Sequence, residues 1–233
     1  MTPTRAIGFA LLAAYSLWLL GLEMSSSQAQ VRPFFSDIGA EMALFGVNTT
    51  LSVALLGGAA LLLLFAGTAG DRQRDSSRVF LLTQAALFAF LAADDRFQLH
   101  ERIAWRLGIG DHHVTLAWAV AELGLLTALW RPTLLPLRAT FLFLAGGALF
   151  MVSFLVDVLA GADTWLRLSV EDLAKTWGAA MFFNFGWETA RFHLRAKPVS
   201  LSDNAFETER WRRSNGANAI KRGAAAGKPV ENS

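Results

Sequence analysis

Residues 79–101 read VFLLTQAALFAFLAADDRFQLHE, an uncharged apolar run that ends abruptly in a charged octet. Residues 79–93 contain no ionisable side chain, and residues 94–101 then bring two aspartates, an arginine, a histidine and a glutamate. This order is typical of a helix that leaves a membrane, because charged side chains are costly inside the hydrocarbon layer. We therefore expect a helix over residues 79–107 that crosses the bilayer and extends beyond it.

The composition of the whole chain agrees with a membrane location. Of its 233 residues, 54% are hydrophobic and 17% are charged, whereas about 25% of the residues in soluble domains are charged. The chain has no cysteine, which excludes disulfides, thiolate zinc sites, iron–sulfur clusters and cysteine nucleophiles. Any bound metal would therefore have oxygen and nitrogen ligands only.

Further apolar segments repeat the pattern of the first, so we expect an all-α integral membrane protein with a bundle of about six transmembrane helices. A helix needs roughly 20 residues to cross the bilayer core. Residues 1–195 would form this helical domain, and residues 196–233, which are polar and basic, would form a disordered cytoplasmic tail. The expected helices cover residues 6–22, 41–66, 79–107, 114–130, 139–160 and 170–193.

Charge separates by side when the six expected spans are laid across a bilayer. Most of the 21 lysines and arginines fall on the side of the two termini, and most of the 19 acidic residues fall on the other side. The positive-inside rule then predicts a cell inner membrane location with both termini cytoplasmic. In the alternative, residues 1–29 form a cleaved signal peptide, because a basic start and an apolar run precede Ser27-Gln28-Ala29, and the N-terminus then lies outside.

Acidic and imidazole side chains from several expected helices gather on the outer side. Carboxylates and neutral imidazoles from separate helices are the usual metal ligands in helix bundles, and they suit zinc, copper, iron or manganese. We therefore predict an outward-facing site for a divalent metal ion. The enzymatic interpretation is a metal-dependent hydrolase or oxidase that uses a metal-activated water on a lipid or small substrate. The predicted ligands are Asp94, Asp95, His100, Glu101, His113, Asp157 and Glu171.

Helical geometry limits what the octet can do by itself. In a regular helix Asp94 and Glu101 share one face, which we expect to point into the bundle. His100 lies about 120° away from Asp94, at about 100° per residue. One straight helix therefore cannot direct Asp94 and His100 at the same ion, and the octet would be half of a site that other helices complete.

Other polar side chains lie within or at the ends of the expected spans. Asn48 and Ser52 recur on one helical stripe, Glu122 lies deep in its span, and Lys175 can reach Glu171 and Asp172 along its own helix. Buried acids favour a second interpretation, a non-enzymatic ion or proton transport protein, or an accessory subunit in which the same residues form salt bridges. The polar candidates are Glu41, Asn48, Glu122, Ser153, Asp172 and Lys175.

Two short resemblances bear on the metal interpretation. Asp95, His100 and His113 resemble the Asp-His-His copper site in the C subunit of particulate methane and ammonia monooxygenases, although the gap from Asp to His here is five residues rather than four. That resemblance implies a transition metal. Ser153, Asp157 and the outer histidines are similar to the zinc-site residues of ceramidase-like membrane hydrolases, without the His-x-x-x-His pair of that family.

The expected partner is the lipid bilayer. Other membrane subunits or a second copy of the chain in a homo-oligomer are further options that the composition leaves open. The basic segment Arg210-Trp211-Arg212-Arg213 is short, so anionic lipid is the expected contact and no nucleic acid is expected.

Overall fold

The computed structural model describes residues 3–26, 28–35, 46–69, 75–130, 135–160, 164 and 166–195. The chain divides into two compact units, Met1–Leu194 and Arg195–Ser233, and the description below concerns the first unit. The predicted disordered tail, residues 196–233, lies outside the described residues, and so does Glu41.

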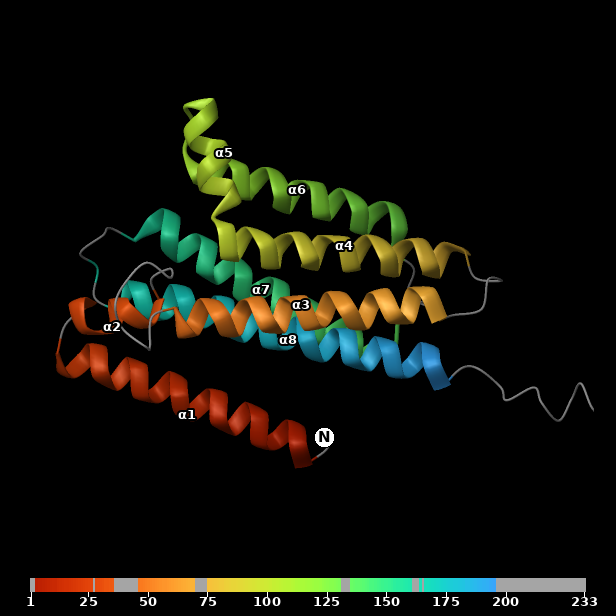
Figure 1. Ribbon diagram of the computed structural model, residues 1–233, viewed down its shortest axis with the longest axis horizontal. Helices are drawn as coiled ribbons and strands as arrows, with labels where there is room; N and C mark the ends of the chain where they lie inside the picture. Colours follow the sequence, from red (N-terminus) through yellow and green to blue (C-terminus); the bar gives the residue numbers. More distant parts are fainter. Residues whose placement is uncertain are drawn as a thin grey trace, which may run out of the picture. The chain divides into compact units, whose positions relative to one another are not determined.

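Every element in the described part of the chain is a helix, which confirms the expected all-α class (Figure 1). The elements are α1 Pro3–Ser25, α2 Gln28–Phe35, α3 Val47–Ala69, α4 Asp75–Phe97, α5 Leu99–Leu107, α6 Asp111–Leu129, α7 Leu137–Leu159 and α8 Arg167–Arg195.

Within the described residues, five helical segments are long and apolar enough to cross a membrane, namely α1, α3, Ser77–Phe97 of α4, α6 and α7. By length and composition the chain is therefore a multi-pass membrane protein with five candidate spans. The sixth expected span, residues 170–193, corresponds to α8, which is not among the five. Charged and amide side chains are distributed along α8, and apolar residues such as Phe182 and Phe185 are buried against other helices.

The core joins α3, α4, α7 and α8 through aromatic and small side chains. The ring of Phe185 lies 6.2 Å from that of Phe88 and 5.1 Å from that of Phe143, between ring centroids. Helix α8 also approaches α3 closely, because a Cβ on Gly186 would lie 3.1 Å from the carbonyl oxygen of Ala59. These contacts fix the register of α8 against α3 and α4, and that register places the polar residues described below.

The expectation of one continuous helix over residues 79–107 is wrong. Helix α4 ends at Phe97, α5 begins at Leu99, and Gln98 between them has left-handed backbone angles of φ 51° and ψ 47°. Figure 1 shows α5 turning away from the axis of α4. The physical reason is local, because Asp94 Oδ1 accepts a hydrogen bond of 2.8 Å from the backbone N–H of His100. A carboxylate that binds this amide offers the backbone an alternative to the helical ladder.

Candidate functional site

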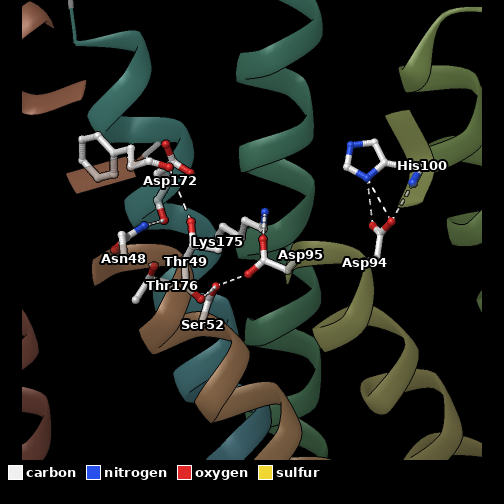
Figure 2. Close-up of polar contacts among 10 residues, drawn as sticks. Asn48, Thr49, Ser52, Asp94, Asp95, His100, Asp172, Lys175 and Thr176 are labelled. Atoms are coloured by element: carbon white, nitrogen blue, oxygen red, sulfur yellow. Dashed lines mark hydrogen bonds and ion pairs between the residues drawn. The ribbon is translucent and has the colours of Figure 1, made fainter. Parts of the chain in front are cut away.

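A buried charged contact joins α3, α4 and α8 at one end of the bundle (Figure 2). Asp95 forms a salt bridge with Lys175 through Oδ1, and Ser52 Oγ donates a hydrogen bond to Oδ2 of the same carboxylate. The Asp95 side chain is 5% exposed and that of Lys175 is 31% exposed. The carboxylate therefore has both oxygens engaged by other helices, while the Lys175 side chain as a whole is partly exposed.

A second set of hydrogen bonds holds α3 to α8 beside this pair. The Asn48 amide donates to the carbonyl oxygen of Asp172 at 3.0 Å and accepts from Thr176 Oγ1 at 2.8 Å. Asn48 is 2% exposed, Ser52 is 1% exposed and Thr176 is fully buried. Asn48 and Ser52, which recur on one helical stripe, therefore both face the interior of the bundle.

The Ser52 hydroxyl has two acceptors and one proton. Besides Asp95, the carbonyl oxygen of Thr49 lies 3.1 Å from Ser52 Oγ in hydrogen-bonding geometry. A hydroxyl can rotate to donate to either acceptor and can also accept a hydrogen bond. Ser52 can therefore adapt to either protonation state of the Asp95 carboxyl group.

Asp94 and His100 form a separate pair next to this contact. His100 Nδ1 lies 2.9 Å from Asp94 Oδ2, and the two side chains are 24% and 16% exposed. The hydrogen bond that the His100 imidazole donates to the Asp94 carboxylate raises the pKa of His100 above its ordinary value of 6.5, against the opposing effect of burial. Figure 2 shows Asp94 turned toward His100 and Asp95 turned toward Lys175, so two adjacent carboxylates serve two different contacts.

The expectation that Asp94 and Glu101 form the interior-facing pair is wrong. Asp95 is the buried aspartate, and Glu101 is exposed on α5. The buried face of α4 carries Gln84, Phe88 and Asp95. It is shifted by one residue from the face with Asp94 that helical periodicity indicated. Glu101 is displaced further because the break at Gln98 reorients everything that follows it.

The acids of α7 and α8 have a basic partner of their own. Arg167 Nη2 lies 2.7 Å from Asp157 Oδ1 and 3.6 Å from Glu171 Oε2. The expected pairing of Lys175 with Glu171 is therefore replaced by a salt bridge to Asp95 on another helix. Ser153 is buried on α7, one turn before Asp157.

The predicted metal ligands do not come together in the described part of the chain. No group of three or more acidic or histidine side chains there is placed to hold a metal ion. Asp94 pairs with His100, and His113 stacks on His112 with ring centroids 4.1 Å apart. Both the Asp-His-His resemblance and the hydrolase resemblance require such a group. The ligand assignment stays a prediction.

A second polar contact, which is partly buried, joins α4 to α6 further from the α5 end of α4, and it includes a residue that the sequence reasoning missed. Gln84 of α4 is fully buried and donates from Nε2 to Glu122 Oε1 at 2.7 Å. Gln84 lies 11 residues from Asp95, about 16 Å along the helix. Phe88 lies between them, 4.7 Å from Phe182 between ring centroids. Gln84 could have been found from the sequence, because its amide side chain stands inside the apolar run of residues 79–93.

Together these observations define a class, a helical domain with five candidate membrane spans and a charged network buried between three helices. A family model matches residues 4–189, and the chain belongs to that family, described as a domain of unknown function (DUF8692). The matched residues include Ser52, Asp95 and Lys175. No curated protein and no solved structure matches the chain.

Proposed function

We propose that the protein is a non-enzymatic transport protein coupled to protons or small cations, with the Asp95 carboxylate as the exchanging group. Lys175 is its internal counter-charge. The observation that carries the proposal is the placement of Asp95, 5% exposed and held by Lys175 and Ser52, in the last turn of a candidate membrane span.

Stability alone is a weak reason for this ion pair. Taking two charges out of water costs several kcal/mol per ion, and replacing a buried pair with apolar residues is often neutral or stabilising by about 1 to 4 kcal/mol. Ionisable residues in membrane helices, by contrast, mark ion pathways and proton relays. Asp95 is a buried ionisable residue in a candidate membrane span, and its partner Lys175 lies on another helix.

The contacts around Asp95 suit a group that changes its charge. When Asp95 binds a proton or a cation, it no longer needs Lys175, whose side chain is already 31% exposed. Ser52 can then accept from the protonated carboxyl group and donate to the Thr49 carbonyl instead. The His100 imidazole, paired with Asp94 one residue away, supports proton entry from the same end of the bundle.

The transport interpretation is preferred to a metal-dependent hydrolase or oxidase because each of the central carboxylates already has a basic partner. Asp95 pairs with Lys175, Asp94 with His100 and Asp157 with Arg167. This matches the salt-bridged alternative drawn from the sequence. The proposal keeps the inner membrane location with both termini cytoplasmic, an orientation that requires α8 to cross the membrane in addition to the five candidate spans. In this orientation the Asp95 end of the bundle faces outward.

Proton uptake by reconstituted protein tests the proposal. Purified protein in liposomes that contain a pH-sensitive dye should admit protons faster than empty liposomes when an electrical potential is imposed. Asp95→Asn should reduce this flux at least tenfold, because the exchanging carboxyl group is lost. Arg167→Gln removes a partly buried ion pair at the same end of the bundle and should keep most of the flux, so it is the matched control.

A double variant separates function from folding. Lys175→Met leaves the buried Asp95 carboxylate unpaired and should cost about 3 to 5 kcal/mol of unfolding free energy. Adding Asp95→Leu removes that charge, so the double variant should recover most of the stability and still show no flux. A double variant that transports protons like the wild type would contradict the proposal. The proposal would also be contradicted if liposomes with wild-type protein took up protons, Na⁺ and K⁺ no faster than empty liposomes.

A further inference from the structure

A cavity of about 700 Å³ lies between α1 on one side and α3 and α8 on the other. Its walls are mainly apolar, and they include Leu12, Leu55, Phe183 and Trp187, with Arg5 as the charged member. None of Ser52, Asp95 and Lys175 lines it, so this cavity is separate from the site described above.

Side-chain contacts hold α1 against α8 near both ends of the cavity. The Trp177 indole N–H donates to Ser16 Oγ at 2.9 Å, and the Phe9 and Trp177 rings stack with centroids 5.9 Å apart. Near the start of α1, Arg5 forms a salt bridge with Glu188. These contacts attach α1 to α8 on both sides of the cavity.

At the charged end of the cavity, Glu188 is the acidic partner of more than one arginine. Arg5 uses Nη1 for Glu188, and Arg138 Nη1 lies 3.6 Å from the same carboxylate oxygen. Two guanidinium groups therefore share one carboxylate. Arg5 Nη2 is buried and has no hydrogen-bond partner among the residues that the structure describes, while the guanidinium lies 5.7 Å from the centre of the Trp187 ring. Buried N–H donors in proteins normally have a hydrogen-bond acceptor, so an acceptor is expected beside Arg5 Nη2.

We propose that the cavity binds an acyl chain of an anionic phospholipid, whose phosphate accepts a hydrogen bond from Arg5 Nη2. The volume falls within the roughly 300 to 1,000 Å³ typical of ligand sites, and the apolar walls suit a hydrocarbon chain. Arginine binds phosphate strongly because its planar group donates charge-assisted hydrogen bonds. Tryptophan beside arginine at a helix end is typical of the membrane interface, where lipid headgroups lie. The inference does not depend on the proposed transport function.

Native mass spectrometry of the purified protein in detergent tests the head-group contact. Phosphatidylglycerol should bind with a stoichiometry of one, and at least tenfold more tightly than phosphatidylcholine or oleate. Arg5→Gln should weaken phosphatidylglycerol binding about tenfold or more, as expected for loss of a charge-assisted hydrogen bond. Arg138→Gln removes the same charge beside Glu188 without lining the cavity, so its binding should stay within twofold of the wild type.

A steric variant tests the chain-binding part independently. Gly8 lines the cavity with nothing within 4 Å of a built Cβ, so Gly8→Leu should fold normally and fill the space that the lipid needs. Gly21, on the same helix, has equal room but does not line the cavity, and Gly21→Leu is the control. Unchanged phosphatidylglycerol binding in Gly8→Leu would overturn the site. Equal binding of oleate, which has no phosphate, would overturn the phosphate assignment. Equal binding of phosphatidylcholine, whose phosphate is offset by a positive choline, would overturn the preference for an anionic lipid.

Discussion

Asp94 and Asp95 are adjacent and chemically identical, yet they serve different contacts. Successive side chains on a helix point about 100° apart, so one aspartate reaches α8 while the other reaches the start of α5. The sequence nominated both residues, but it placed Asp94 rather than Asp95 in the interior. A charge-rich octet shows that ionisable groups are present, whereas their partners depend on which helices lie opposite.

The Asp94–His100 pair should make stability depend on pH. The pKa of His100 is raised in the folded protein, so the protonated histidine stabilises the fold, and this contribution is complete below the unfolded pKa of about 6.5. It is lost as pH rises through the raised folded pKa. At about pH 6, where the pair contributes about 0.5 to 1 kcal/mol to the unfolding free energy, the wild type should unfold at a higher temperature than His100→Gln. This difference in unfolding temperature should shrink as the pH is raised to about 9.

His113→Gln is the control for this measurement, because His113 stacks on His112 instead of pairing with Asp94. The unfolding temperatures of His113→Gln over the same pH range are the reference for those of His100→Gln. If the stability difference between wild type and His100→Gln grew with rising pH, the protonated histidine would not stabilise the fold. That result would contradict the pairing of His100 with Asp94.

The break between α4 and α5 is the element-scale feature that periodicity could not indicate. Residues 79–107 contain neither glycine nor proline, so nothing in the composition marks an end to the helix at residue 98. The decisive contact is the Asp94 side chain on the His100 amide, together with a left-handed backbone at Gln98. Because that contact competes with a helical hydrogen bond of similar strength, local sequence alone leaves the outcome undecided.

Gln98 itself provides a test of this break. A residue other than glycine in the left-handed region carries a steric cost of roughly 1 to 2 kcal/mol. Gln98→Gly should therefore raise the unfolding free energy by up to about 1 kcal/mol, whereas Gln98→Val should lower it by at least as much. Thermal unfolding of the purified variants measures both. The increase in unfolding free energy for Gln98→Gly is expected only if the helix is broken at this residue. A decrease would indicate that α4 and α5 form one continuous helix.

At the scale of the whole molecule, the order of the candidate spans fixes which segments share a side. The end of α4 with α5 and the segment after α7 should lie on one side of the membrane, because α6 and α7 form two crossings between them. The chain has no cysteine, so single cysteines can be introduced directly. Trp105→Cys and Thr164→Cys, both at exposed positions, should react with an impermeant thiol reagent from the same side, and Thr68→Cys from the other.

In intact cells, the predicted orientation means that Trp105→Cys and Thr164→Cys react from outside. Reaction of these two positions from opposite sides would remove one of the crossings formed by α6 and α7. Reaction of Thr68→Cys alone from outside would keep the spans and invert the orientation.

The sequence by itself determined the all-α class, the apolar helices and the polar positions Asn48, Ser52, Asp95 and Lys175, because hydrophobicity and helical spacing are local properties of the chain. Only the tertiary structure decided that Lys175 pairs with Asp95 rather than with Glu171, that Gln84 meets Glu122, and that Arg5 borders a cavity. The physical reason is that these contacts join residues far apart in the chain, and their geometry follows from the packing register of α3, α4 and α8.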